Sequence, residues 1–214
     1  MATPTSPSEP AGRSRRVTRN PERAQERILT AAMAEFAAKG FAGARVDGIA
    51  RRARINKRML YHYFGNKEDL FHAILQRKLT ERAEWLAKAP PDPTESIPYW
   101  FELACGDMNW IRLLQWEALQ AESGLLIDEK KRLANIETSV EMMRRSQKDG
   151  LLAPDLDPRH ALLTMISLIT FPLAFPQITK LVTGLEATDP AFQKARKEFL
   201  RRFAVAFKPR ASGK

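Results

Sequence analysis

A short segment, residues 44–70, leaves few folds open to this chain: ARVDGIARRARINKRMLYHYFGNKEDL. Its apolar residues have helical spacing on either side of a tight turn, which predicts two short helices at about 46–52 and 57–64. Small side chains near the turn would let these helices cross closely, and the pattern is typical of a helix-turn-helix. The expected apolar contacts between them are Ile49, Ala50, Ala53, Ile55, Leu60 and Phe64.

The outward face of the second short helix follows from a rotation of 100° per residue. With Leu60 and Phe64 inward, the outward side chains are Arg58, Met59 and His62, with Lys57, Tyr61 and Tyr63 on the flanks. Cations of this kind pair with guanine O6 and N7, and a methionine can contact a thymine methyl group. Asn56 is placed to cap this helix, and Lys67 suits a phosphate contact at the start of the next one. A solvated basic face without a partner is the alternative.

The remainder of the chain is also expected to be helical. Asn20 and Pro21 suit the start of a first helix that ends at Gly40, and a long helix is expected over 67–88. Three prolines near residue 90 then mark a boundary. Further helices are expected at about 94–105, 108–121, 126–149, 158–182 and 189–208. Because no run of alternating β-branched residues occurs, the predicted fold class is all-α, with about nine helices.

The predicted organisation has four parts. Residues 1–19 are expected to be a disordered tail with a basic arm that includes Arg15 and Arg16. A helix-turn-helix domain is expected over 20–75, a helical domain over 76–208 and a flexible tail over 209–214.

The positive charge of the chain is concentrated near its N-terminus. Residues 1–80 contain 16 Lys and Arg against 7 Asp and Glu, whereas residues 81–214 contain 19 against 18. A basic segment attached to a nearly neutral one indicates a polyanion-binding module on a separate globular body. A basic surface without a partner would produce the same charge asymmetry. The helix-turn-helix pattern is therefore needed to choose between a DNA-binding module and such a surface.

Cysteine content and hydropathy indicate a cytoplasmic protein. Cys105 is the single cysteine, which excludes an intramolecular disulfide and fits a reducing compartment. The first 12 residues lack the apolar core of a signal peptide. The most apolar run, 161–176, is shorter than the roughly 20 residues that span a bilayer, so no membrane partner is expected.

The side chains that perform catalysis or bind metals are few and scattered. The histidines are His62, His72 and His160, and no group of them with Cys105 has metal-ligand spacing. No nucleophile motif and no glycine-rich phosphate loop after a strand is present. We therefore expect neither an enzyme nor a bound metal or cofactor.

The stretch from Arg27 through Leu75 resembles the DNA-binding domain of TetR family transcriptional regulators. The family spacing Leu-Tyr-x-x-Phe-x-x-Lys-x-x-Leu is matched at Leu60, Tyr61, Phe64, Lys67 and Leu70. Other residues that carry the resemblance are Ile28, Ala31, Ala32, Phe36, Lys39, Gly40, Phe41, Ile49, Ala50 and Ala53. The resemblance implies that positions 57, 58, 59, 61, 62 and 63 face an operator and that Lys67 holds a phosphate.

Two departures from the family pattern affect the same region. Where the family commonly begins the first short helix with Ser or Thr, this chain has Ala44 and Arg45, and Arg45 is the alternative phosphate contact. Where the family commonly has Gly in the turn, this chain has Arg54. A left-handed conformation at that residue would cost about 1 kcal/mol.

The last two expected helices are unusually apolar and need burial against something. The resemblance implies that they form a homodimer interface, and operator reading by this motif normally needs two copies one DNA turn apart. The expected interface residues are Leu168, Pro172, Phe192, Phe199 and Phe203. The alternative is an ordinary core within one protomer.

The resemblance further implies a cavity for a small-molecule effector within the helical body. Several aromatic and polar residues on the middle helices and the penultimate helix are candidates, although ordinary core packing also explains them. The candidates are Trp100, Cys105, Trp110, Trp116, Glu117, Phe171 and Phe175. Many aromatic side chains with few charges would suit an apolar or aromatic ligand.

Together these expectations describe a ligand-responsive transcriptional regulator that acts as a repressor. It would bind double-stranded, palindromic operator DNA as a dimer and be released by a small-molecule effector. The alternative is a constitutive or activating dimeric DNA-binding protein without an effector. A closed cavity of a few hundred Å³ would favour the sensor, and a filled core would favour the alternative.

Overall fold

The computed structural model of this chain describes residues 21–119 and 128–209, and those residues form helices without any strand. The expected arm residues Arg15 and Arg16, the tail 1–19 and nearly all of the tail 209–214 lie outside the described residues. The all-α fold class is therefore confirmed.

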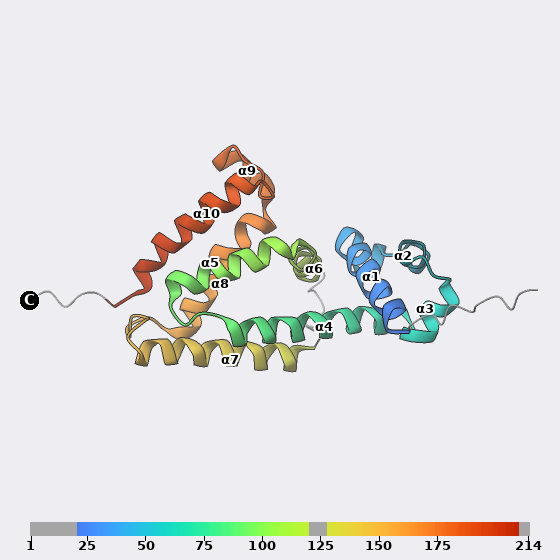
Figure 1. Ribbon diagram of the computed structural model, residues 1–214, viewed down its shortest axis with the longest axis horizontal. Coiled ribbons are helices and arrows are strands. Elements are labelled where there is room, and N and C mark those ends of the chain that lie inside the picture. The colour runs from blue at the N-terminus through green and yellow to red at the C-terminus, as the bar shows by residue number, and fades with distance from the viewer. Residues whose placement is uncertain (1–20, 120–127, 210–214) are drawn as a thin grey trace, which may run out of the picture.

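Figure 1 shows a small head joined to a larger body by one long helix. The head is made by α1, α2 and α3, and α4 runs from the head into the body, where α7 lies alongside it. The bounds in this first half are α1 Pro21–Gly43, α2 Val46–Ala53, α3 Lys57–Phe64 and α4 Lys67–Lys88. Since α4 belongs to both parts, the head is oriented by a helix that is also packed into the body.

The body is a bundle in which α5 and α8 are central and α10 packs on the outside against α5. The helices are α5 Pro93–Gly106, α6 Met108–Leu119, α7 Glu129–Lys148, α8 Pro158–Ala174, α9 Pro176–Thr183 and α10 Pro190–Phe203, followed by a 3₁₀ helix, Ala204–Phe207. The described residues thus contain ten α-helices, one more than the sequence predicts.

Helix starts are set by local caps. The Asn56 side chain accepts a hydrogen bond from the Met59 N–H at 2.7 Å, and Asn66 accepts one from the Asp69 N–H at 2.8 Å. In the body, an aspartate followed by proline at the first helical position begins α5, α8 and α10. Both devices satisfy or remove backbone donors that would otherwise lack a partner, which is why these starts can be predicted from sequence.

Gly40 has a second role beyond the expected helix end. Its backbone has φ 68° and ψ 175°, a region open almost only to glycine, and α1 continues beyond this kink to Gly43. A Cβ atom on Gly40 would lie 2.9 Å from the Trp116 ring of α6. The glycine therefore permits both the kink and the close approach of α6 to α1.

The expectation of one helix over 158–182 is wrong. The structure has two helices, α8 and α9, bent by 86° at Phe175. Pro176 has no N–H to continue the helix, and its ring disfavours the helical conformation of the residue before it, which has φ −122° and ψ 64°. The bend turns α9 away from the axis of α8 and leaves Phe171 and Phe175 exposed.

One hydrophobic core extends from the head into the body. Its largest fully buried side chains include Phe36 of α1, Leu60 of α3, Ile74 of α4 and Phe101 of α5. Continuous packing of this kind fixes the helices against one another, since interiors are dense and deform little.

In the described part of the chain, no single helix is both long enough and apolar enough to span a membrane. Only α8 and α9 taken together have that length and apolar character, and the two are bent relative to each other.

Candidate nucleic-acid interface and effector cavity

The turn between α2 and α3 brings the two short helices together. Arg54 has φ 53° and ψ 48°, the left-handed conformation, and the Ile55 N–H donates to the Ala50 carbonyl oxygen at 3.0 Å. Ala50, Ala53 and Leu60 are buried where the helices cross. A non-glycine residue in this conformation costs about 1 kcal/mol.

The outward side of α3 carries exposed side chains that can reach a base edge. Arg58, Tyr61 and His62 are exposed, while Met59 and Tyr63 are half-buried. No hydrogen bond or ion pair engages Arg58 within the described residues. The major groove of DNA is wide enough to admit an α-helix. A cation, a phenol and an imidazole on one short helix supply hydrogen-bond donors and acceptors that can pair with base edges there.

Lys57 differs from Arg58 because it already has a partner. Its Nζ lies 3.0 Å from Asp47 Oδ1, and this hydrogen bond raises the pKa of Lys57 above its ordinary value. Both side chains are exposed, so the ion pair contributes little to stability and a phosphate can replace the carboxylate.

Arg45 and Lys67 lie on the segments before and after α3, which is the recognition helix of the helix-turn-helix. Arg45 is exposed at the start of α2, and its side chain makes no capping hydrogen bond there. The Lys67 Nζ instead lies 3.4 Å from the Ala42 carbonyl oxygen and 4.7 Å from the centre of the Phe41 ring. Lys67 thus ties α4 to the end of α1 in addition to its expected phosphate contact.

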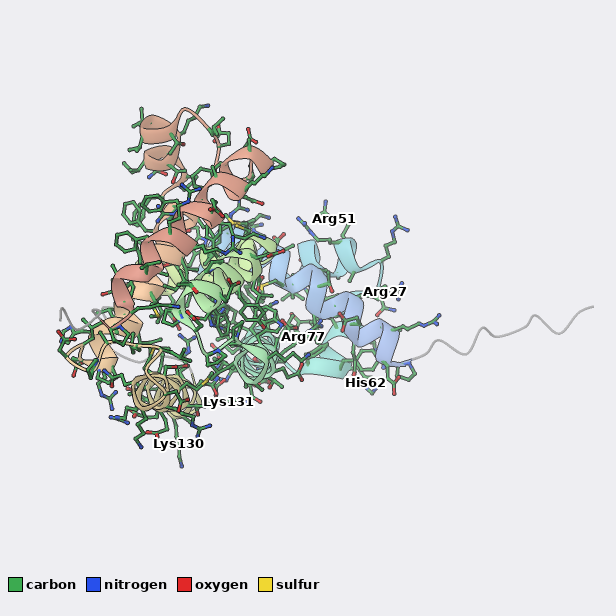
Figure 2. All side chains as sticks on the ribbon, turned by 60° about the vertical axis from the view of Figure 1, so that its left-hand side comes forward. Arg27, Arg51, His62, Arg77, Lys130 and Lys131 are labelled. Atoms are coloured by element: carbon green, nitrogen blue, oxygen red, sulfur yellow. The ribbon has the colours of Figure 1, made fainter. Side chains whose placement is uncertain are left out.

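The head has further exposed arginines that were not among the site residues predicted from the sequence. Arg51, Arg52 and Arg54 are exposed at the end of α2, and Arg27 is exposed on α1. Figure 2 shows Arg27, Arg51 and His62 spread over the head. The run ARRAR at residues 50–54 was the available signal. Arg52 also lies 3.7 Å from the buried Glu35, which accepts a hydrogen bond from Lys39 at 2.6 Å.

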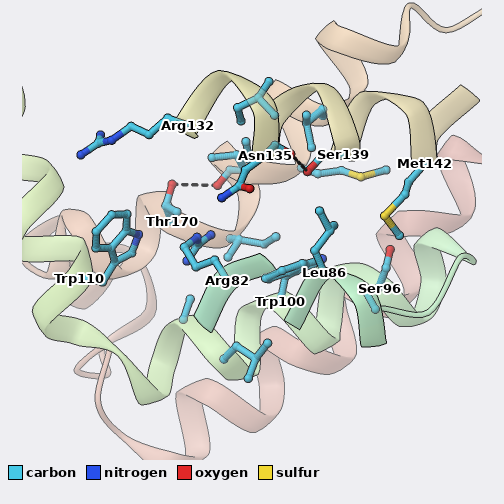
Figure 3. Close-up of a pocket in the computed structure, with 18 of the residues that line it drawn as sticks. Arg82, Leu86, Ser96, Trp100, Trp110, Arg132, Asn135, Ser139, Met142 and Thr170 are labelled. Carbon is cyan, nitrogen blue, oxygen red and sulfur yellow. Dashed lines mark hydrogen bonds between the residues drawn. The ribbon is translucent and has the colours of Figure 1, made fainter. Parts of the chain in front are cut away.

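The body contains a partly open cavity of about 410 Å³ lined by residues of α4, α5, α6, α7 and α8. Most of its lining is apolar, and it includes Trp100 of α5 and Trp110 of α6. Figure 3 shows Arg82, Trp100 and Trp110 on one side, facing Asn135, Ser139 and Met142 of α7. This volume lies in the range of pockets that hold small organic ligands.

Of the expected effector contacts, Trp100 and Trp110 line the cavity and five others do not. Cys105 is half-buried away from it, and burial raises the pKa of this thiol to about 11. The Trp116 Nε1–H donates to the Ala37 carbonyl oxygen at 3.2 Å. Glu117 accepts two hydrogen bonds from Arg132, at 2.7 and 2.9 Å. Phe171 and Phe175 lie on the surface with ring centres 5.0 Å apart.

Helical phase explains why the two tryptophans of α6 differ in position. Trp110 and Trp116 are six residues apart, which separates their directions by about 120° around the helix axis. Trp110 can therefore face the cavity only if Trp116 faces elsewhere, toward α1. Several cavity residues had no distinguishing pattern in sequence, among them Arg82, Ser96, Asn135, Ser139, Met142 and Thr170.

The expected dimer residues divide into two groups. Pro172 and Phe192 are buried within the protomer, where they pack against its own core. Leu168 is half-buried against the core. Phe199 and Phe203 are 51% and 42% exposed, and their rings stack with centres 5.8 Å apart. Leu163 of α8 and Val205 are exposed as well.

A basic helix-turn-helix head, fixed by a shared helix to a helical body with an apolar cavity, defines a DNA-binding transcriptional regulator rather than an enzyme. The family model "Bacterial regulatory proteins, tetR family" matches residues 28–74, and "Tetracyclin repressor-like, C-terminal domain" matches residues 100–205. The chain belongs to the TetR family of transcriptional regulators.

Relatives and solved structures agree with this assignment. HTH-type transcriptional repressor SCO4008 of Streptomyces coelicolor is 31% identical over 78% of this chain and 86% of its own length. Repressor NicS of Pseudomonas putida is 27% identical over 84% and 88%. The crystal structure of putative transcriptional regulator SCO4942 from Streptomyces coelicolor has a TM-score of 0.73 at 28% identity, covering 88% and 99%. FadR of Bacillus subtilis, solved with stearoyl-CoA, shares the fold at 21% identity and a TM-score of 0.60, covering 82% and 96%.

Proposed function

We propose that this protein is a ligand-responsive repressor that binds a palindromic operator as a homodimer and releases it when a small apolar or aromatic molecule enters the cavity. The observation that carries the proposal is the course of α4. Near its start, Lys67 contacts the head, and further along, Leu79, Arg82 and Leu86 line the cavity. A rigid helix packed at both ends conveys a displacement at the cavity to the recognition helix.

A second connection runs through α6. Trp110, Ile111 and Leu114 of this helix line the cavity, whereas Trp116 contacts Gly40 and Ala37 of α1. A ligand that favours one position of α4 and α6 shifts the population toward that position. The separation of the two recognition helices in the dimer changes with it, so that only one of them docks well.

The proposed operator contacts are the ones that the sequence of α3 and of its flanking segments predicts. Arg58, Met59, Tyr61, His62 and Tyr63 read base edges. The backbone contacts come from Arg45, from Asn56 and the helix start it caps, from Lys57 and Lys67, and from Arg15 and Arg16 on the arm. This division agrees with the general rule that phosphate contacts position a protein and base contacts specify the sequence.

Exposed apolar side chains support the homodimer. Phe199 and Phe203 of α10, with Leu163 of α8 and Val205, are large side chains that one protomer leaves in water. A two-fold axis through this face would bury them against their copies and place two recognition helices on successive half-sites.

For the domains, we propose a DNA-binding part at 20–75 and an effector-binding and dimerisation part at 76–208, flanked by tails at 1–19 and 209–214. The division at residue 75 falls inside the continuous helix α4. Such a junction supports direct coupling between the two parts.

The test begins with selection of bound sequences from random duplex DNA, followed by titration of the selected operator. We expect a palindrome with half-sites about one helical turn apart. Arg58→Ala should weaken binding by about 10- to 100-fold and relax the preference at one base pair, since a bidentate base contact contributes about 1–3 kcal/mol. The matched control is Arg144→Ala, an exposed arginine of α7. Unchanged operator affinity and preference in Arg58→Ala would contradict the proposed recognition face.

The second candidate is a constitutive or activating dimeric DNA-binding protein without an effector. The cavity favours the sensor, because a purely structural body has no need of an open volume of this size. Operator affinity that no cavity-bound molecule alters would favour the second candidate.

A further inference from the structure

Arg82 is the cavity residue whose chemistry is least explained by packing. It projects from α4 into a cavity whose lining is mostly apolar but also contains Asp107, and its guanidinium carbon lies 5.6 Å from the ring centre of Trp100 and 5.7 Å from that of Trp110. Burial lowers the pKa of Arg82 from its ordinary value, but the guanidinium stays charged at neutral pH. A cation in such a position is costly unless an acceptor compensates for the lost water.

The neighbouring carboxylates are engaged elsewhere. Asp107 lies near enough to act on Arg82 electrostatically, but its Oδ2 is 3.0 Å from the Lys78 Nζ. Glu81 pairs with Arg77 and with the same Lys78. Within residues 21–119 and 128–209, no carboxylate lies within ion-pair distance of Arg82.

The other charged residues of the cavity do not compete for the same role. Arg132 is held by two hydrogen bonds to Glu117, and Glu129 is exposed at the edge. Asn135 donates to the Leu79 carbonyl oxygen at 3.3 Å. Among the described residues, no hydrogen bond or ion pair engages the Arg82 guanidinium, whereas Arg132 uses both of its terminal nitrogens on Glu117 and keeps only its Nε without a partner.

We propose that the effector is an apolar or aromatic monocarboxylate, with its carboxylate on Arg82 and its apolar body along Trp100 and the facing residues of α7. This inference rests on the proposed function and names the chemical class of its ligand. A guanidinium matches a carboxylate in a bidentate geometry, and the paired ions gain strength where water is excluded. The two tryptophan rings hold the guanidinium between them and form an apolar wall beside it.

The test uses three probes with one skeleton: 4-phenylbutyrate, 4-phenylbutanamide and 4-phenylbutylamine. Their dissociation constants for the wild-type protein are measured by calorimetry. The acid should bind at least 10-fold more tightly than the amide, and the amine should bind most weakly. Equal or weaker binding of the acid, or no binding of the acid at millimolar concentration, would overturn the proposal.

Two variants locate the effect. Arg82→Met keeps the apolar stem and should weaken acid binding by about 10- to 100-fold while leaving the amide within twofold, because a charge-assisted contact is lost. Arg132→Met, at a cavity arginine already paired with Glu117, should change the acid-to-amide ratio by less than threefold. An unchanged ratio in Arg82→Met would overturn the assignment to Arg82. The wild-type comparison stands even if a variant fails to fold.

Operator binding measured with the same probes separates this proposal from the proposed function. Release of the operator by the acid supports both. Selective binding of the acid without any change in operator affinity would uphold the carboxylate site and refute effector-controlled regulation. Release by the amide or the amine alone would uphold regulation and overturn the carboxylate site.

Discussion

Replacement of Gly40 by alanine tests how tightly the head is fixed to the body. At φ 68° and ψ 175°, a side chain costs about 1–3 kcal/mol. The added Cβ would also lie 2.9 Å from two atoms of the Trp116 ring, and overpacking of this kind costs about 1–3 kcal/mol. We therefore expect Gly40→Ala to lower the free energy of unfolding by about 2–6 kcal/mol.

The assay is urea and thermal unfolding followed by circular dichroism. For a chain of this size, each kcal/mol moves the thermal midpoint by about 2–4 °C, so a fall of at least about 4 °C is expected. Two glycines with open space around them serve as controls. Gly184→Ala, at φ 76°, should show only the backbone cost of about 1–2 kcal/mol, and Gly106→Ala should be neutral or slightly stabilising.

A double-mutant cycle isolates the ring contact. If the clash is real, Gly40→Ala should cost less in a Trp116→Ala background, because the backbone cost alone remains. A midpoint for Gly40→Ala equal to that of Gly106→Ala would refute the reasoning, and so would equal costs of Gly40→Ala with and without the Trp116 ring.

Three further measurements concern separate sites. The hydrogen bond from Lys39 holds the pKa of Glu35 below 4.5, so its stabilisation is present above about pH 4.5 and lost as pH falls through the lowered pKa. Glu35→Gln should flatten the pH dependence of the urea midpoint between about pH 5 and 3; an unaltered slope would contradict this. Because burial raises the Cys105 pKa from 9.0 to about 11, Ellman's reagent at pH 8 should react about 100-fold more slowly than with unfolded protein, and equal rates would exclude the shift. Phe199→Glu with Phe203→Glu should give monomers in sedimentation velocity, whereas Leu119→Glu, at an exposed leucine, should not; a dimer that survives the double change would place the interface elsewhere.

The head is the part that sequence reasoning described best. The predicted ranges 57–64 and 67–88 agree with α3 and α4, and the predicted cap at Asn56 is present. These features depend on contacts between residues three or four positions apart, which the order of residues specifies directly. Arg54 does adopt the left-handed conformation whose cost was considered from the sequence, at the turn position where the family commonly has Gly.

The body was described well in class and poorly in detail. An apolar pattern shows that a helix has a buried face, but the neighbouring helices decide whether that face meets core, cavity or solvent. Trp110 and Trp116 looked equivalent as aromatic residues of one helix, and the packing of α6 between α1 and the cavity assigned them opposite roles.

The same reason explains why the expected positions of several residues of α8 and α10 differ from the observed ones. Phe171 and Phe175 were expected at the ligand and lie on the surface, while Pro172 and Phe192 were expected at an interface and lie in the core. Local chemistry at Pro176 breaks the helix, but the direction in which α9 then points is set by packing against α8. Contacts close in sequence thus set the helix ends and the recognition face, and contacts distant in sequence brought Arg82 between two tryptophans and made the cavity.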